Sequence, residues 1–283
     1  MHSWQTSRRT LGLDRTFVMA ILNITPDSFS DGGQYLSVAE ALERAQTMIA
    51  EGADLIDIGG ESTRPGSVRV TSHDEIERIR PAVTAIRERF DIPISVDTSK
   101  AEVAEAALQA GAEIINDISG LRFDERIAEV VARNKAGLVL MHSRGEFESM
   151  HSQTPVENIM EDVAADFRRS IDAADKYGIA HEQIVLDVGI GFGKTLDQNL
   201  ELIAKIDKLA AEFPSYALLV GASRKSFIGK LLGDGGASER LSGSLAAAAV
   251  AAWNGARIVR VHDVKETVEC LKIVDAARAS LNR

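Results

Sequence analysis

The sequence predicts an α/β protein that folds as a single (β/α)8 barrel over residues 1–283. Short apolar runs alternate with longer amphipathic stretches along the whole chain, and eight of each are present. Most of the apolar runs are continuous, which is typical of parallel strands that are buried on both faces. Eight strands in strict alternation with eight helices favour a closed barrel, and a doubly wound open sheet is the alternative.

The predicted strands are short runs dominated by Ile, Val and Leu. They occupy residues 17–22, 55–58, 94–96, 113–116, 138–141, 184–186, 218–220 and 258–261. Residues 1–15 precede the first of these runs and are polar, so we expect an N-terminal extension before the first barrel strand.

The predicted helices lie between and after the strands, at residues 37–51, 72–89, 100–109, 126–133, 156–176, 196–212, 239–253 and 265–279. Glycine follows five of them, where a residue in the left-handed conformation commonly ends a helix. These glycines are Gly52, Gly111, Gly137, Gly178 and Gly255. The sequence Asp97-Thr98-Ser99 precedes the third helix, and we expect it to cap that helix.

Composition restricts the class of protein. The net charge of −10 argues against a general nucleic-acid or acidic-membrane surface, so any anionic substrate requires a local group of cations. Cys270 is the single cysteine of the sequence, which excludes a disulfide framework. Residues 1–15 contain no apolar signal segment, and the longest apolar run, residues 245–253, is too short to span a bilayer. We therefore expect a cytoplasmic enzyme that acts on small molecules.

Polar and ionisable residues follow nearly every predicted strand. In a barrel of this kind the active site lies at the carboxyl ends of the strands, so these residues are the candidates for its chemistry. They are Asn23, Glu61, Ser62, Thr63, Arg64, Asp97, Asn116, Asp117, His142, Asp187, Ser223, Arg224, Lys225, Arg260 and His262. Long loops rich in Gly, Ser and Thr follow the first two strands, at residues 24–36 and 61–70, and we expect them to act as lids.

Two other interpretations of the motifs fail. Residues 189–195 resemble a phosphate-binding loop, but Val188 occupies the position of its first glycine, and Lys194 stands where the dinucleotide-binding fingerprint requires its third glycine. Asp97 and Asp187 match the carboxylate pair of a glycosidase, but that interpretation leaves the cationic residues without a purpose.

Six segments carry a resemblance to a known family: residues 21–33 (ILNITPDSFSDGG), 57–66 (DIGGESTRPG), 94–98 (ISVDT), 114–117 (IIND), 223–226 (SRKS) and 260–263 (RVHD). In this order they make the chain similar to the dihydropteroate synthases, the pterin-binding barrel family of folate biosynthesis. The chain departs from the usual family pattern at three places. Val188 replaces a common proline, Ala222 replaces a common methionine, and residues 143–146 (SRGE) differ from the usual sequence.

The resemblance implies a transferase. It joins 6-hydroxymethyl-7,8-dihydropterin diphosphate to 4-aminobenzoate, with Mg2+, and releases 7,8-dihydropteroate and diphosphate through a dissociative, carbocation-like step. It also implies a homodimer and assigns Asn23 as the ligand of Mg2+, which needs few protein groups when a diphosphate supplies oxygens. Thr63, Arg64 and Ser226 become candidates for binding aminobenzoate.

The remaining roles follow from the chemistry of the substrates. A carboxylate accepts from the amino group and adjacent ring N–H of a pterin together, which suits Asp187. Asn116 and Lys225 match the mixed edge and the carbonyl of the pterin ring. Arg260 and His262 lie two residues apart on one face of a strand, where both can reach and neutralise the diphosphate. Asp97 is placed to stabilise a cation on the pterin methylene carbon.

Two alternatives stay open at this point. One is another pterin-binding barrel, such as a methyl-transfer domain, which would not need the aminobenzoate loops. The other is a non-catalytic relative that binds pterin without turnover. The presence of Asn23, Arg64 and Lys225 argues against the second alternative.

Overall fold

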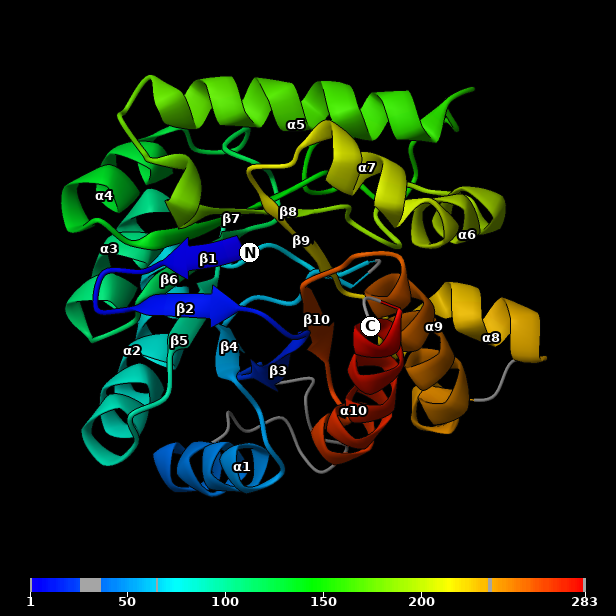
Figure 1. The fold of residues 1–283 in the computed structure, drawn as a ribbon. Helices are drawn as coiled ribbons and strands as arrows, with labels where there is room; N and C mark the ends of the chain where they lie inside the picture. Colours follow the sequence, from blue (N-terminus) through cyan, green and yellow to red (C-terminus); the bar gives the residue numbers. More distant parts are fainter. Residues whose placement is uncertain (1, 26–36, 65, 234–235, 282–283) are drawn as a thin grey trace.

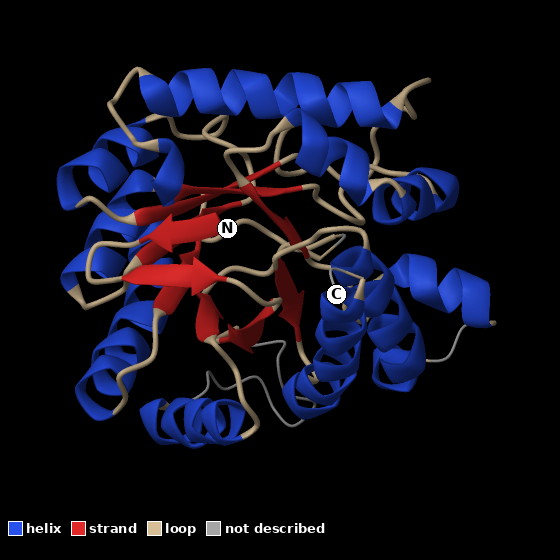
Figure 2. Ribbon diagram, in the orientation of Figure 1, coloured by secondary structure: helices blue, strands red, loops and turns tan. Residues whose placement is uncertain are grey.

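The computed structural model describes residues 2–25, 37–64, 66–233 and 236–281. Within these residues, parallel strands close into a barrel in the order β10-β3-β4-β5-β6-β7-β8-β9, with the helices arranged around it (Figures 1 and 2). The closing pair is β10 with β3, in the register Ile258 to Phe17. This pairing confirms the predicted barrel and excludes the open sheet.

Both ends of every barrel strand lie within one residue of the predicted positions. They are β3 (Phe17–Asn23), β4 (Leu55–Gly59), β5 (Ile94–Asp97), β6 (Ile114–Asp117), β7 (Gly137–Met141), β8 (Ile184–Asp187), β9 (Ala217–Val220) and β10 (Ile258–Val261). Nearly all of their residues are buried, as expected for strands with helices on one face and the barrel interior on the other.

The surrounding helices are α1 (Val38–Ala50), α2 (Ser72–Arg89), α3 (Ala101–Gln109), α4 (Arg126–Asn134), α5 (Ile159–Asp175), α6 (Leu196–Ala204), α7 (Ile206–Glu212), α8 (Ser226–Leu232), α9 (Leu241–Trp253) and α10 (Val264–Ser280). The predicted helix at residues 196–212 is divided in two, because Lys205 departs from helical geometry at φ −114° and ψ 24°. Helix α8 was not predicted. Among the helices described, none has both the length and the apolar character needed to cross a membrane.

Two predictions about helix ends were wrong. Gly137 does not end a helix but is the first residue of β7, and Lys135 takes the left-handed position at the end of α4, with φ 50°. The sequence Asp97-Thr98-Ser99 does not cap α3. The first N–H of that helix, at Ala101, instead donates to Asp124 Oδ2 at 2.9 Å.

The residues before the first barrel strand form an antiparallel hairpin, β1 (His2–Gln5) and β2 (Thr10–Leu13). Trp4 of this hairpin is fully buried and donates its indole N–H to the carbonyl of Gln183 at 2.9 Å. It packs among residues from the amino-terminal ends of the barrel strands, including Met19 and Leu55. The hairpin therefore covers the end of the barrel opposite to the polar strand ends.

Candidate active site

The predicted site residues lie at one rim of the barrel. Asn23, Asp97 and Asp187 are the last residues of β3, β5 and β8. Because all the barrel strands are parallel, their carboxyl ends meet at the same mouth. The predicted lid at residues 24–36 lies outside the described residues from residue 26 onward, whereas the loop 61–70 is described except at residue 65.

A charged network links four strands across the mouth. Arg260 of β10 donates from Nε to Asp57 Oδ2 of β4 at 2.6 Å and from Nη2 to Asp97 Oδ2 of β5 at 2.9 Å. Asp57 Oδ2 also accepts from Asn116 Nδ2 at 3.0 Å. The network thus orients Asn116, Arg260 and Asp97, which the sequence predicted for the site, through Asp57, which it did not.

Asp57 is fully buried in the middle of the strand sequence LIDIG. A carboxylate inside an otherwise apolar parallel strand is costly to bury unless it is paired. The sequence contains this signal, but Asp57 lies inside a strand and therefore not among the candidate residues at the strand ends. The other oxygen of Asp57, Oδ1, has no hydrogen-bond partner among the described residues.

Two carboxylates share the single guanidinium of Arg260. Burial, with a smaller contribution from the neighbouring charge of Asp57, raises the pKa of Asp97 to about 7, and Arg260 opposes this change. Arg260 therefore contacts both carboxylates. The pKa of Asp97 lies close to neutral pH, so this carboxyl group can gain or lose its proton there. A carboxylate in this position can respond electrostatically to a positive charge on a ligand.

Asp187 and Lys225 form the second charged part of the mouth. Asp187 Oδ1 accepts from the backbone N–H of Gly189 at 2.8 Å, which fixes the carboxylate and leaves Oδ2 for a ligand. Lys225 Nζ donates to the carbonyl of Ile190 and lies 4.6 Å from the centre of the Phe192 ring. Burial lowers the pKa of Lys225 to about 8, although the charge of Asp187 opposes this shift.

The loop after β8 holds Lys225 in place. Gly189 and Gly191 both have positive φ, at 64° and 84°, a backbone conformation that residues other than glycine rarely adopt. A Cβ atom on Gly189 would lie 1.9 Å from the carbonyl oxygen of His142. Lys194 Nζ donates to the carbonyls of Gly189 at 2.7 Å and Phe192 at 3.2 Å, so this lysine braces the loop from within. The resemblance to a phosphate-binding loop is therefore superficial.

His262 lies at the end of β10 and contacts Ser223. Its Nδ1 lies 3.1 Å from Ser223 Oγ, and its backbone N–H donates to the same oxygen. Burial, together with the charges of Arg260 and Arg224, lowers the pKa of His262 to about 3. This lowering of the pKa favours the neutral ring, with Nδ1 accepting from Ser223 Oγ. In this form His262 can donate a hydrogen bond from Nε2, and its part in binding the diphosphate stays a prediction.

The residues predicted to bind aminobenzoate lie at the edge of the mouth. Arg64 is exposed, yet it is near enough to His262 to contribute to the lowering of its pKa. The carbonyl of Thr63 lies 2.7 Å from His151 Nε2, and Ser226 is the exposed first residue of α8. No hydrogen bond described for these three residues joins them to Asp187 or Lys225. A bound substrate would therefore have to connect the aminobenzoate residues to the Asp187–Lys225 pair.

Several polar residues at strand ends serve the scaffold instead of the mouth. Asp117 accepts from the backbone N–H groups of Ser119 and Leu121, which fixes the turn after β6. Arg224 pairs with Asp263 at 3.0 Å. The ring of buried His142 faces α5, where its Nε2 lies 3.1 Å from Asp162 Oδ2.

Gly59 of β4 lies beside Asn23 at the end of β3. Gly59 pairs with Asn23 in the barrel, and a Cβ atom on Gly59 would lie 3.3 Å from Asn23 Oδ1 and 3.8 Å from Asp97 Cβ. Glycine therefore leaves the side of the Asn23 amide oxygen that faces β4 without a side chain. No group of three or more His, Cys, Asp or Glu residues in the described part of the chain could hold a metal ion by itself. A metal held here would need most of its ligands from substrate and water.

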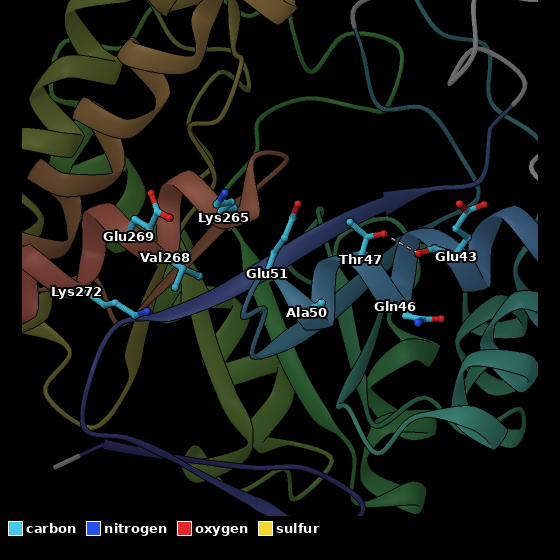
Figure 3. A pocket seen from close by; sticks show the side chains of 9 residues that line it. All are labelled: Glu43, Gln46, Thr47, Ala50, Glu51, Lys265, Val268, Glu269 and Lys272. Atoms are coloured by element: carbon cyan, nitrogen blue, oxygen red, sulfur yellow. Dashed lines mark hydrogen bonds between the residues drawn. The ribbon is translucent and has the colours of Figure 1, made fainter.

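A separate hollow lies on the outside of the barrel, between α1 and α10 (Figure 3). Its volume is about 690 Å3, and its lining includes Glu43, Glu51, Lys265 and Lys272. It contains none of the residues predicted for the site, and its mixed surface charges give it no evident chemistry.

The closed barrel and its polar mouth, which carries Asp187 with Lys225 on one side and the Arg260 network on the other, define the class of (β/α)8-barrel enzymes. Residues 19–262 match the family of pterin binding enzymes. A dihydropteroate synthase from Synechocystis sp. is 48% identical over 262 residues, which cover 93% of this chain and 90% of the relative. The chain belongs to the pterin binding enzymes and, among them, to the dihydropteroate synthases.

Solved structures agree with this assignment. A Yersinia pestis dihydropteroate synthase in a sulfonamide drug complex is 45% identical and superposes with a TM-score of 0.92, covering 98% of this chain and 99% of its own. A Xanthomonas albilineans dihydropteroate synthase with 4-aminobenzoic acid is 39% identical, with a TM-score of 0.91 and coverage of 98% of both chains. The family assignment replaces the glycosidase interpretation of Asp97 and Asp187.

Proposed function

We propose that this chain condenses 6-hydroxymethyl-7,8-dihydropterin diphosphate with 4-aminobenzoate to give 7,8-dihydropteroate and diphosphate. The observation that carries the proposal is the barrel mouth, where Asp187 with Lys225 and Asp57 with Asn116 and Arg260 form two adjoining polar groups. The curated relatives and solved structures that share this barrel are dihydropteroate synthases.

The pterin ring occupies the floor of the mouth. Its amino group and ring N–H donate to Asp187, whose carboxylate is oriented by Gly189. Asn116, fixed through Nδ2 by Asp57, presents its carbonyl oxygen to a ring donor. Lys225 donates to the pterin carbonyl, exchanging its contact with the Ile190 carbonyl for one with the substrate.

The diphosphate lies at the end of β10 and beside β3. Arg260 supplies the positive charge and His262 a neutral N–H donor, since burial keeps the pKa of this histidine low. The amide oxygen of Asn23, beside Gly59, would hold Mg2+, which would need its other ligands from the diphosphate and water. When bound, Mg2+ would neutralise charge on the leaving diphosphate.

The C–O bond to diphosphate breaks with its electron pair leaving on oxygen, and the pterin delocalises the positive charge of its methylene carbon. Asp97, near this carbon and partly neutralised by Arg260, stabilises that charge in its ionised form. The neutral amine of aminobenzoate then forms the C–N bond, and its extra proton is released to water. Thr63, Arg64 and Ser226 hold the aminobenzoate. No strong base is required before attack.

We also propose a cytoplasmic homodimer. Val250 and Trp253 of α9 and Ile273 of α10 are large apolar residues with exposed fractions of 45%, 47% and 73%. Helices α9 and α10 pack side by side, so these residues can contribute to one apolar face between two copies. Sedimentation of the protein, with Trp253→Glu as a disrupting variant, tests this proposal.

Release of diphosphate that depends on both substrates tests the proposed reaction. Formation of dihydropteroate with one diphosphate per product is the expected result. Binding of pterin without turnover would instead support a non-catalytic pterin-binding protein. Transfer of a methyl group would support the other pterin-binding class.

A further inference from the structure

His151, in the connection between β7 and α5, lies between two loops of the mouth. Its Nε2 is 2.7 Å from the carbonyl oxygen of Thr63, and its Nδ1 is 3.3 Å from that of Gly191. These partners are 88 and 40 residues away in the sequence and belong to the loops after β4 and β8. One side chain therefore joins the expected aminobenzoate loop to the loop that holds Lys225.

The side of this bridge formed by Gly191 is well fixed. The His151 ring stacks on Phe192, with 5.2 Å between ring centres and 28° between planes. Gly191 donates its N–H to Asn199 Oδ1 at 2.6 Å, and Lys194 braces the same loop through two carbonyls. His151 therefore rests on a firm support.

The side formed by Thr63 is held mainly at its base. Glu61 Oε1 accepts from Lys100 Nζ at 2.9 Å and from the N–H of Val70 at 2.7 Å, which closes the loop at its two ends. Between them, the hydrogen bonds described for Arg64 are made within the loop, to Ser62 and Ser67. Among the hydrogen bonds described for residues 62–64 and 66–68, the one between Thr63 and His151 joins the loop to another part of the chain.

We infer that His151 is a positioning residue that holds Thr63 and Arg64 over the mouth and so preforms the aminobenzoate site. This inference rests on the proposed function. Both partners of the ring are carbonyl oxygens, which only accept, so the shorter contact has the His151 Nε2–H donating to the Thr63 carbonyl. On the other side the ring is held by its stacking on Phe192, not by a hydrogen bond from Nδ1. Holding the loop in its binding conformation lowers the ordering cost of binding a small substrate.

Two substitutions separate the hydrogen bond from the packing of the ring. His151→Phe keeps a ring against Phe192 but removes the donor, whereas His151→Gln keeps an N–H donor but removes the ring. We expect His151→Phe to raise KM for 4-aminobenzoate by roughly five- to tenfold, the effect of one lost hydrogen bond. We expect kcat and the Kd of the pterin diphosphate to change less than about twofold, because Asp187 and Asn116 are untouched. His151→Gln should restore most of the aminobenzoate affinity.

Hydrogen exchange gives a readout that does not depend on turnover. Peptides covering residues 61–70 should exchange faster in His151→Phe than in wild type or His151→Gln, while peptides covering β8 stay unchanged. Wild-type KM and exchange in His151→Phe, or equal damage in both variants, would overturn the inference. A wild-type protein that releases no diphosphate from the two substrates would overturn the proposed function instead, and the exchange comparison would still decide the role of His151 in holding the loop.

Discussion

Arg260 and Asp57 are 203 residues apart in the sequence and are joined at 2.6 Å across the mouth of the barrel. The contact requires β10 and β4 to lie on either side of β3, an arrangement that exists only when the barrel is closed. Asp57 in turn fixes Asn116, so this ion pair links the structural closure of the barrel to the geometry of its site.

Removing Asp57 should damage stability and activity together. Asp57→Ala leaves Arg260 without one of its two carboxylates in a buried setting and removes the partner of Asn116. We expect the free energy of unfolding in urea to fall by on the order of 3 kcal/mol, as for other broken buried pairs. The matched control is Asp91→Ala, which removes the exposed partner of Arg9 and should leave the unfolding midpoint unchanged. Equal effects in the two variants would contradict the special role of Asp57.

Pterin binding should depend on both members of the carboxylate–lysine pair. Asp187→Asn and Lys225→Ala should each weaken pterin binding by on the order of 2–4 kcal/mol, because each leaves a charged group in a desolvated contact without its partner. Calorimetric titration of the pterin measures this directly. The control is Lys230→Ala, which changes an exposed lysine in α8, the helix that begins directly after Lys225. Near wild-type affinity in both site variants would end the assignment.

The affinity for pterin should fall as the pH rises above about 8. Burial lowers the pKa of Lys225 to about 8, so its ammonium is present below this pH and is lost above it, earlier than for an exposed lysine. Titration of the pterin between pH 6.5 and 9.5 against Lys225→Gln separates this ionisation from that of the ligand. The difference between wild type and variant should decrease with rising pH, and a constant difference would show that the charge of Lys225 is not used.

Turnover should require Mg2+ and depend on Asn23. Excess chelator should abolish diphosphate release, and Asn23→Ala should weaken both the apparent metal affinity and the rate, since the amide oxygen beside Gly59 is the proposed protein ligand. Full activity in chelator would remove the metal from the mechanism. Unchanged metal affinity in Asn23→Ala would show that another residue is the protein ligand of Mg2+.

The two substrates should bind in order, with the pterin diphosphate first. His151 holds the backbone of Thr63, but the side chain of Arg64 is exposed. Aminobenzoate is small and offers little surface to order that side chain, whereas the diphosphate offers it a complementary charge. Titration of 4-aminobenzoate should show much tighter binding when pterin and diphosphate are present. Equal affinity with and without them would rule out ordered binding.

The sequence by itself determined the barrel and most of its candidate site. Continuous apolar runs and helical periodicity are local properties, so they placed all barrel strands to within one residue. The rule that parallel strands present their carboxyl ends at one mouth then brought Asn23, Asp97, Asn116 and Asp187 together. The resemblance to the family assigned their chemistry.

Only the tertiary structure decided how these groups are paired and charged. The contacts of Asp57 with Arg260 and of His151 with Thr63 join segments far apart in the chain, and no local pattern encodes them. The low pKa of His262 arises from burial beside Arg260 and Arg224, and desolvation depends on everything packed around a group, not on its neighbours in sequence. Strand and helix positions are therefore set locally, whereas the protonation and orientation of the site are set by closure of the barrel.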